Sequence, residues 1–460
     1  MPRQIHITLL ILIVLLSACN LGSHNYNNLG NNNTPSSNDF TWISGSDSAE
    51  QVGVYGTQGT ADAINTPGAR QYALSWTDDN GNIWLFGGYG LDAGGTASGY
   101  LNDLWRFDGS DWTWIAGSNA INQPGTYGTQ GAADMANIPG GRSKAVGWID
   151  ANGNLWLFGG IGYDSSGSSV AELNDLWQYD ITNKTWTWVS GSKLNSASGC
   201  YSSAACTPVQ PGSRERATGW IDSNGTFLWL FGGTGKDANG TSGFLNDFWK
   251  FDIANSTWTW AGGSDTVNQN GSYSAAAMPG GREGATGWVD ADGYLWLFGG
   301  YGLDRNGTTG NLNDLWQYTT AWTWSGNGDQ TVNAAGKYSS PLFVPGARNG
   351  ATGWTDSDGN LWLFGGLGYD VGGNQGHLGD VWMFDRIGNT GWNWITGENT
   401  VDQSGTYGTR GTGAATNLPG AREGAAGWSS APGTVWLFGG NGMDGHGAAG
   451  NLNDLWRYTQ

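Results

Sequence analysis

The chain has few of the residues on which most catalytic and nucleic-acid-binding sites depend. Its 460 residues include only 3 cysteines, 4 histidines and 19 lysines and arginines, against 38 aspartates and glutamates. The net charge of −19 and the absence of basic clusters argue against nucleic-acid binding. They also leave no basic patch that would hold the chain on an anionic membrane surface.

The scarcity of histidine and cysteine also limits the metal chemistry. Only His377 and His446 lie beyond residue 40. The sequence contains no zinc-ligand spacing, no phosphate-binding glycine loop and no Ser-His-Asp set. Residues 290–293 and 356–359 resemble calcium loops, but each lacks the bidentate acid further along, and each occupies a predicted hairpin. We therefore expect no metal and no cofactor, with calcium as the alternative.

Helical patterns are missing too, and tryptophan and glycine are abundant instead. All 29 tryptophans fall into a pattern that repeats six times, among 81 glycines. The Gly-Gly pairs begin at positions 87, 159, 232, 299, 365 and 439, which gives steps of 72, 73, 67, 66 and 74 residues. A long period of nearly fixed length indicates a repeat architecture.

The second copy shows what one repeat contains. Strand a is predicted at 142–148, strand b at 155–160, strand c at 174–180 and strand d at 185–189, with the Asn152-Gly153 turn between a and b. Strand b is apolar on both faces, as expected between neighbouring sheets, whereas strand d alternates like an outer strand. Four strands per radially repeated unit predict a β-propeller, in which the tryptophans pack between blades.

The connections between strands differ in length. The a–b and c–d turns are short, whereas the b–c loop is about a dozen residues, as in 90–102, and the d–a loop roughly twenty-five, as in 116–141. The two long sets lie on the same face of the disc. Because long loops on a rigid scaffold are the usual seat of binding, this loop-rich face is the candidate functional face.

The sixth copy lacks an outer-strand tryptophan pair. It has only Trp428, Trp436 and Trp456, while Trp42 stands alone near the other end of the chain. We predict that the strand at 40–43 joins the last blade and closes the ring without an exposed edge.

The repeat resembles that of the Kelch family over residues 40–460. The resemblance rests on the diglycine after an apolar strand, on a tryptophan a few residues further on, and on an aromatic residue at Phe107, Tyr179, Phe251, Tyr318, Phe384 and Tyr458. The period is about 70 residues where Kelch units have nearer 50, and Pro-Gly-x-Arg replaces Pro-Arg, so we expect the surplus length in loops. The resemblance implies an all-β, six-bladed Kelch-type propeller with four antiparallel strands per blade.

Three regions are predicted along the chain. A lipoprotein signal peptide covers 1–18, an Asn/Ser-rich flexible tether 19–39, and the propeller 40–460. The blade cores are expected at about 70–115, 142–189, 214–261, 282–325, 348–395, and 422–458 plus 40–43.

The N-terminus predicts export and a lipid anchor. Arg3 and the apolar run 7–16 form a leader too short to span a membrane stably. Residues 16–19, Leu-Ser-Ala-Cys, resemble a bacterial lipobox, which implies lipidation of Cys19; an ordinary secretory leader with a chance cysteine is the alternative. Asn20 resembles the residue found in lipoproteins sent to the outer membrane, so we expect attachment there, in either the periplasmic or the surface leaflet.

The two remaining cysteines, Cys200 and Cys206, lie in the loop before the third blade. An oxidising compartment favours their pairing as a local disulfide. A metal pair is the alternative, but no histidine is nearby.

Two series of opposite charge recur in every blade. An arginine opens each strand a, at Arg70, Arg142, Arg214, Arg282, Arg348 and Arg422. An aspartate opens each strand c, at Asp103, Asp175, Asp247, Asp314, Asp380 and Asp454. Because a guanidinium can hold a carboxylate through two hydrogen bonds, we predict six structural ion pairs that fix the long loops.

Two further series recur in the loops. A Gly-x-Asp motif opens each b–c loop, and its aspartate is expected to cap a turn. A tyrosine recurs in every d–a loop and is expected to anchor that loop, at Tyr55, Tyr127, Tyr201, Tyr273, Tyr338 and Tyr407.

The two residues after each strand-a arginine vary most between blades. A residue present in all six blades is explained by the scaffold, whereas a site for an asymmetric ligand should use residues that break the repeat. The candidate ligand-binding residues at the channel mouth are therefore Tyr72, Lys144, Glu215, Arg216, Glu283, Asn349 and Glu423. Sequence drift at solvent-exposed positions is the alternative.

These observations favour a monomeric binding module for a protein or glycan, with no catalytic residue assigned. The Kelch-like propeller of galactose oxidase uses copper, two histidines, two tyrosines and a thioether-linked cysteine. Beyond residue 40 this chain has only His377 and His446 and no free cysteine in position to serve, so we do not expect that chemistry. Another Kelch-like class, the sialic acid mutarotases, is six-bladed and exported. The resemblance to that class implies the alternative function, a carbohydrate isomerase or mutarotase using Glu215, Glu283 or Glu423 with Arg216.

Overall fold

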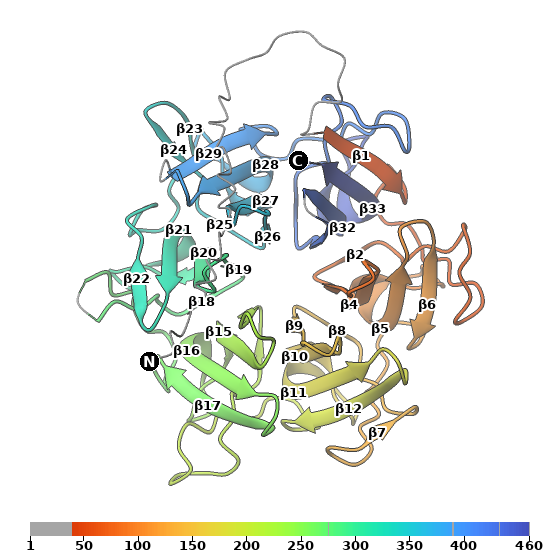
Figure 1. Cartoon of the computed structure of the whole chain (residues 1–460), viewed down its shortest axis with the longest axis vertical. Helices are drawn as coiled ribbons and strands as arrows, with labels where there is room; N and C mark the ends of the chain where they lie inside the picture. The colour runs from red at the N-terminus through yellow and green to blue at the C-terminus, as the bar shows by residue number, and fades with distance from the viewer. Residues whose placement is uncertain (1–38, 275, 389–390, 432, 460) are drawn as a thin grey trace, which may run out of the picture. The chain divides into compact units, whose positions relative to one another are not determined.

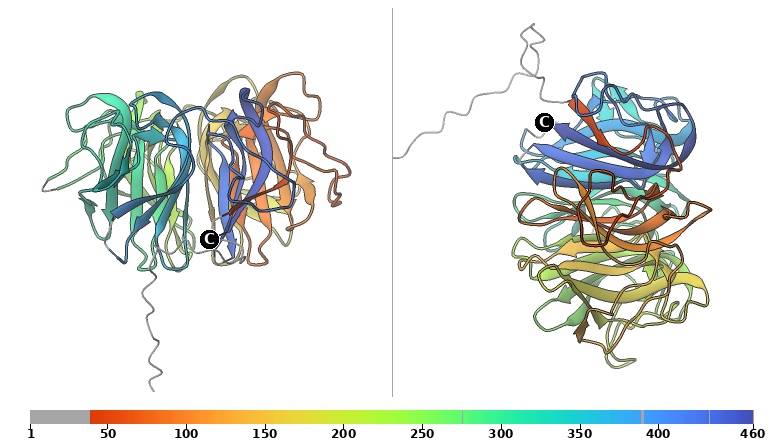
Figure 2. Two further views of the ribbon diagram at one scale, coloured as in Figure 1. Left: turned by 90° about the horizontal axis from the view of Figure 1, so that it is seen from above. Right: turned by 90° about the vertical axis from the view of Figure 1, so that its right-hand side faces the viewer.

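The computed structural model describes residues 39–459 except 275, 389, 390 and 432. In this part of the chain every regular element is a β-strand, and six antiparallel sheets stand around a central axis (Figure 1, Figure 2). The prediction of an all-β six-bladed propeller is confirmed. The described residues contain no helix long and apolar enough to cross a membrane. The predicted leader, Cys19 and the tether up to residue 38 lie outside the described residues.

Blades 1 to 3 follow one another along the chain. Blade 1 contains β2 (Arg70–Gln71), β3 (Leu74–Thr77), β4 (Ile83–Leu91), β5 (Ser98–Phe107) and β6 (Trp112–Ala116). Blade 2 contains β7 (Ala133–Asp134), β8 (Arg142–Ser143), β9 (Val146–Ile149), β10 (Leu155–Tyr163), β11 (Val170–Asp180) and β12 (Thr185–Ser190). Blade 3 contains β13 (Arg214–Glu215), β14 (Thr218–Ile221), β15 (Phe227–Lys236), β16 (Ser242–Asp252) and β17 (Thr257–Gly262).

Blades 4 to 6 complete the ring. Blade 4 contains β18 (Arg282–Glu283), β19 (Thr286–Val289), β20 (Leu295–Leu303), β21 (Thr309–Tyr318) and β22 (Trp322–Trp324). Blade 5 contains β25 (Arg348–Asn349), β26 (Thr352–Thr355), β27 (Leu361–Tyr369), β28 (Gln375–Asp385) and β29 (Gly391–Thr396), and the hairpin of β23 (Lys337–Ser339) and β24 (Leu342–Val344) precedes it. Blade 6 contains β30 (Arg422–Glu423), β31 (Ala426–Ala431), β32 (Thr434–Met443), β33 (Ala449–Thr459) and β1 (Asp39–Ser44).

The innermost strand of each blade is broken in two, which the sequence did not predict. In blade 1 the pieces β2 and β3 both pair with β4, but Tyr72 between them has a φ of 51°. This left-handed conformation interrupts the ladder, and neither Tyr72 nor Ala73 has a pairing partner in β4. Strand a of each blade therefore has one short piece at the loop-rich face and a longer piece below it.

Strands b and c are longer than predicted, and the b–c loops are correspondingly shorter. In blade 1 the ladder between β4 and β5 extends to the pair Leu91 and Ser98, so six residues, 92–97, connect the strands rather than the predicted dozen. The ladder continues because the diglycine forms a β-bulge between Phe86 and Gly88 and does not end the strand.

The diglycine is required where neighbouring blades meet. Gly87 has a φ of +63°, and a Cβ there would lie 2.8 Å from the carbonyl oxygen of Arg142 in blade 2 and 2.8 Å from that of Leu101. A side chain would clash with both backbones. Glycine at this position thus allows strand b of one blade to touch strand a of the next.

Aromatic side chains fill the space between blades. Trp84 and Phe86 of β4 contact Tyr179 and Trp186 of blade 2, with ring centroids 5.9 Å and 5.4 Å apart. Trp105 and Trp177 at the matching place in their own blades are fully buried. The tryptophan repeat therefore builds the core between sheets.

The N-terminal strand closes the ring as predicted. β1 pairs antiparallel with β33, with Trp42 opposite Trp456 and Phe40 opposite Tyr458. In blade 1 the same positions pair Trp114 with Trp105 and Trp112 with Phe107. Phe40 therefore takes the place of the tryptophan that blade 6 lacks.

We predict that Phe40→Ala destabilises the propeller by about 3–5 kcal/mol, because it leaves a cavity in the closing strand. Phe40 is 1% exposed and packs on Phe364 of the neighbouring blade. Urea unfolding followed by tryptophan fluorescence measures the change. The control is Tyr294→Ala, which removes an aromatic ring that is 40% exposed and should cost little. Equal stability of the two variants would contradict closure through β1.

Candidate functional site

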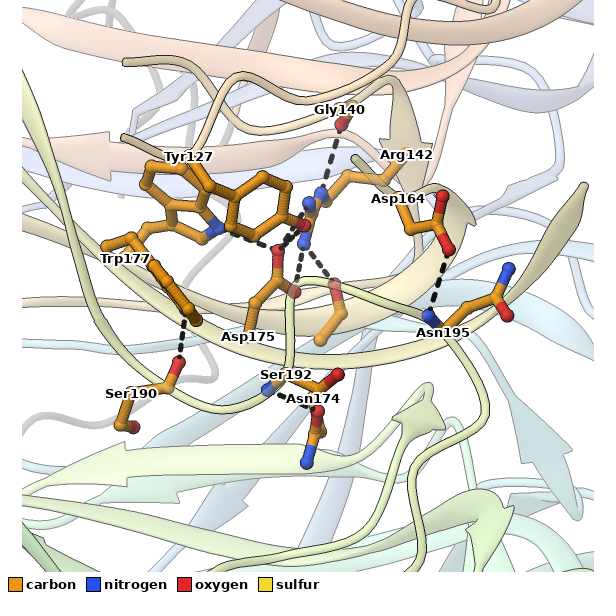
Figure 3. A network of polar contacts seen from close by, with 12 residues as sticks. Tyr127, Gly140, Arg142, Asp164, Asn174, Asp175, Trp177, Ser190, Ser192 and Asn195 are labelled. Atoms are coloured by element: carbon orange, nitrogen blue, oxygen red, sulfur yellow. Dashed lines mark hydrogen bonds and ion pairs between the residues drawn. The ribbon is translucent and has the colours of Figure 1, made fainter. Parts of the chain in front are cut away.

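Every strand-a arginine forms a buried ion pair with the strand-c aspartate of its own blade. In blade 2, Nη1 and Nη2 of Arg142 donate to the two carboxylate oxygens of Asp175 at 2.7 Å and 2.8 Å. Nε and Nη1 of Arg142 also donate to the carbonyls of Gly140 and Gly159, both at 3.0 Å (Figure 3). All six predicted pairs are present, with closest N–O distances of 2.6–2.7 Å.

The aspartate of each pair also holds the long d–a loop. In blade 2, Oδ2 of Asp175 accepts hydrogen bonds from the Tyr127 hydroxyl at 2.6 Å and from Nε1 of Trp177 at 2.7 Å. Burial, together with the Asp175 carboxylate, raises the pKa of Tyr127 well above its ordinary value. The hydroxyl therefore stays protonated and donates. The other loop tyrosines bind their aspartates in the same way, at Tyr55, Tyr201, Tyr273, Tyr338 and Tyr407.

The Gly-x-Asp series connects two loops. In blade 2, Oδ1 of Asp164 accepts from the backbone N–H of Ser166 at 2.8 Å, and Oδ2 accepts from that of Asn195 at 3.1 Å. The first bond caps the b–c turn and the second fixes the following d–a loop. These aspartates therefore support the loops that surround the channel mouth.

The two segments that resemble calcium loops are hairpins closed by their own hydrogen bonds. Oδ1 of Asp290 accepts from the backbone N–H groups of Asp292 and Tyr294, and Oδ2 accepts from Nε1 of Trp296 at 2.8 Å. Asp356 makes the equivalent bonds in blade 5. Within the described ranges no group of three or more His, Cys, Asp or Glu is placed to hold a metal ion.

Cys200 and Cys206 form a disulfide in the loop between blades 2 and 3. Cys200 also makes a backbone bridge with Gln210, so this loop folds back on itself. The described residues contain no other cysteine.

A closed ring of backbone hydrogen bonds surrounds the channel at the break in strand a. The second residue after each strand-a arginine has a φ of 51–64°, at Tyr72, Lys144, Arg216, Gly284, Gly350 and Gly424. The N–H of each donates to the carbonyl of its counterpart in the preceding blade at 2.8–3.1 Å, and Tyr72 donates to Gly424. The six blades are therefore tied to each other at the channel mouth by main-chain contacts.

Three of the six residues in this ring are glycines, and the other three have large side chains. A Cβ on Gly424 would lie 2.9 Å from the Tyr72 ring, and a Cβ on Gly284 would lie 2.8 Å from Nη2 of Arg216. The glycines of blades 4 to 6 thus leave room for side chains that reach across from blades 1 and 3. Tyr72, Lys144 and Arg216 keep a strained backbone, and such strain is a feature of functional sites.

Arg216 is the centre of a cluster that spans the channel. Its Nη2 donates to the Tyr72 hydroxyl at 2.7 Å, and its Nη1 lies 3.2 Å from Oε1 of Glu283. It also donates to the side-chain oxygen of Asn349, and the Tyr72 hydroxyl donates to Glu423. Five of the seven predicted ligand-binding residues, each from a different blade, are therefore joined in one cluster of contacts.

The other two predicted residues form an adjacent pair. Nζ of Lys144 lies 3.0 Å from Oε2 of Glu215. Burial raises the pKa of Glu215, and this outweighs the opposing effect of Lys144. Lys144 also lies over the Tyr72 ring, 5.9 Å from its centroid, which connects the pair to the central cluster.

A cavity of about 270 Å³ opens above this cluster, on the side of the b–c loops. It is lined by Gln71, Tyr72, Tyr89, Tyr100, Ser143, Lys144, Arg216 and Glu423. A second cavity of about 170 Å³ continues the channel below, between the ring residues and the alanine that follows each of them.

Two residues that line the cavity, Tyr89 and Tyr100, were not predicted from the sequence. They pair across β4 and β5, with ring centroids 5.2 Å apart in an edge-to-face arrangement. Tyr89 directly follows the diglycine of blade 1, and the same position holds Ile161 and Thr234 in the next two blades. These positions also differ between blades, and that difference in strands b and c is the sequence signal that marks them.

The structure is a six-bladed β-propeller with a polar channel mouth. The chain matches no known family, and no curated protein is similar to it in sequence. Among solved structures it is similar to YjhT, with 15% identity over 85% of this chain and 95% of that one, and a TM-score of 0.49. No conclusion about function follows from a similarity of this size.

We predict that Asp175→Asn destabilises the protein by about 3–5 kcal/mol, because it leaves Arg142 buried beside an uncharged amide. Thermal unfolding and urea titration measure the loss. Asp358→Asn is the matched control, since Asp358 lies in an exposed hairpin. A loss below 1 kcal/mol for Asp175→Asn would contradict the structural role of the pair.

Proposed function

We propose that the propeller is a binding module whose channel mouth receives the terminal sugar of a glycan. The observation that carries this proposal is the cavity of about 270 Å³ above Arg216, lined by three tyrosines and by charged groups that differ between blades. It is smaller than the 300–1,000 Å³ typical of sites for drug-sized ligands, so it suits one sugar unit.

The chemistry of the lining supports a sugar ligand. Tyr72, Tyr89 and Tyr100 offer both an apolar ring and a hydroxyl, which matches the apolar face and the hydroxyls of a sugar. Arg216 and Lys144 are each paired with a glutamate, so their charges are already compensated. The site therefore recognises its ligand mainly through hydrogen bonds and ring contacts.

The proposal includes the location predicted from the N-terminus. Cleavage before Cys19 and lipidation of that residue would attach the propeller to the bacterial envelope, at the outer membrane. Residues 19–38 are then the tether between the lipid and β1, which begins at Asp39. In this arrangement the propeller acts as a monomer that holds a glycan, or a glycan-bearing protein, close to the membrane.

A carbohydrate isomerase or mutarotase is the second candidate function, and one observation favours it. Burial raises the pKa of Glu215 above its ordinary value. A general acid or base works best when its pKa lies near the working pH, so this shift is in the useful direction. Glu215 is the last residue of β13, and Arg216, which follows it directly, lines the cavity.

We predict that Tyr100→Ala weakens glycan binding at least tenfold, because it removes one aromatic wall of the cavity. A glycan array on the soluble fragment 40–460 identifies the ligand, and calorimetry with that glycan measures the loss. Tyr294→Ala is the matched control, since Tyr294 lies on an a–b hairpin away from the cavity. The absence of any bound glycan, or equal binding by both variants, would contradict the proposal.

If the second candidate is correct, the fragment accelerates sugar mutarotation and Glu215→Gln abolishes the acceleration. The substitution keeps the size of the side chain but removes its ability to exchange a proton. Proton NMR of freshly dissolved sugars measures the rate, with Glu398→Gln, an exposed residue of the loop after β29, as control. An unaccelerated rate with the wild-type fragment rules out this candidate and leaves the binding module.

A further inference from the structure

The outer edge of three blades is covered by a segment of the chain itself. In blades 1, 2 and 6 the d–a loop that leads into the blade runs along the outermost strand and contributes a backbone bridge to it. In blade 2 this segment includes β7, which lies beside β12 in Figure 1. Such a cover satisfies the hydrogen-bonding groups that an edge strand otherwise exposes.

The cover uses the same chemistry each time. In blade 2 the N–H of Gly131 donates to the carbonyl of Trp188 at 2.8 Å, and the side-chain amide of Asn137 donates to the carbonyl of Trp186 at 3.0 Å. Gly59 and Asn65 make the equivalent bonds in blade 1, and Gly411 and Asn417 make them in blade 6. The sequence requirement is therefore a glycine and an asparagine separated by five residues, Gly-x5-Asn.

Blade 3 has no such cover. Its leading loop, 191–213, contains no Gly-x5-Asn segment, and the Cys200–Cys206 disulfide closes it into a short turn. Among the described residues, nothing forms a backbone bridge or a backbone hydrogen bond with the outward-facing carbonyls of Trp258 and Trp260 in β17.

The side chains of β17 are more exposed to solvent than those of the covered strand β12. Thr257, Thr259, Trp260 and Ala261 are all exposed, and Trp260 is 36% exposed, whereas every residue of β12 in blade 2 is buried or half-buried. Tyr201 still contacts the inner side of Trp260, with ring centroids 5.3 Å apart, as Tyr127 contacts Trp188 in blade 2. Blade 3 therefore keeps the tyrosine–tryptophan contact found beneath the covering segment of blade 2, but it lacks the segment itself.

The edge also lacks the usual protection against pairing. The six residues of β17, Thr-Trp-Thr-Trp-Ala-Gly, include no charge and no proline. Natural proteins commonly blunt exposed edges with lysine, proline or a covering loop. An uncharged open edge in a chain of net charge −19 is therefore suited to a partner that adds a strand.

We propose that the outer edge of β17 binds an extended Gly-x5-Asn segment of a partner protein by strand addition. The glycine N–H donates to the carbonyl of Trp260, and the asparagine amide donates to that of Trp258. The occupant is inferred from blades 1, 2 and 6, where the chain supplies this segment to itself. The site lies on the rim of the disc, away from the channel mouth, and does not depend on the glycan proposal.

A peptide from the chain itself tests the proposal. The probe is a synthetic peptide of residues 126–139, the covering segment of blade 2, and its matched control carries Gly131→Pro, which lacks the donating N–H. Fluorescence anisotropy should show binding of the first peptide to wild-type 40–460 and at least tenfold weaker binding of the second. Failure of the first peptide to bind at millimolar concentration, or equal binding of both, overturns the proposal.

A loop graft places the binding on β17. In this variant residues 201–212 are replaced by the sequence of 127–140, so that blade 3 covers its own edge. We expect at least a tenfold loss of peptide binding compared with wild type. Unchanged binding would overturn the assignment to β17. The proposal would also be overturned if sedimentation showed a wild-type dimer that the graft abolishes, because a second copy of the chain would then occupy the edge.

Hydrogen exchange of the wild-type protein gives a readout that does not depend on the graft folding. The amide of Trp258 should exchange faster than that of Trp186, which pairs with Asp134 of β7, and should become protected when the peptide is added. Equal protection of these two amides without peptide would overturn the proposal, because the edge of β17 would then already be covered.

Discussion

The structure depends on one buried ion pair that is repeated in each blade. A guanidinium without partners would be very costly in this interior, but each strand-a arginine donates to two carboxylate oxygens and to two backbone carbonyls. The same carboxylate accepts from a loop tyrosine and from a tryptophan of strand c. One aspartate thus joins the inner strand, the third strand and the longest loop of its blade.

In each blade, the arginine that belongs to the scaffold is followed directly by the residues of the candidate site. The arginine of strand a is invariant among the blades because its partners are invariant, whereas the next two residues differ between blades and supply the side chains of the cluster at the channel mouth. Tyr72 and Arg216 reach across the axis because the ring positions opposite them are glycines. The hydrogen-bonded ring keeps the backbone regular while its side chains differ, so an asymmetric polar site is built on a nearly symmetric frame.

The parts of the fold that were predictable are those set by local pattern. The tryptophan period, the diglycines and the Asn-Gly or Asp-Gly turns are each determined by residues close together in the sequence. These patterns predicted the number of blades and the order of the strands. The lengths of strands b and c were wrong, because whether the ladder continues past Gly87-Gly88 depends on the contact of Gly87 with Arg142 in the next blade. Tyr89 and Tyr100 were missed because they face the channel only once strands b and c extend beyond the bulge.

The sequence alone determined the six-bladed ring, its closure by the segment around Trp42, and the residue types at the mouth, because repetition makes each copy a prediction for the others. The tertiary structure alone decided which of those residues touch. Arg216 contacts Tyr72, Glu283 and Asn349 from three other blades, and no local spacing encodes a contact across the axis. The tertiary structure also showed that β17 lacks a covering segment. Whether an edge strand is covered depends on where a distant loop runs, and local sequence does not encode that path.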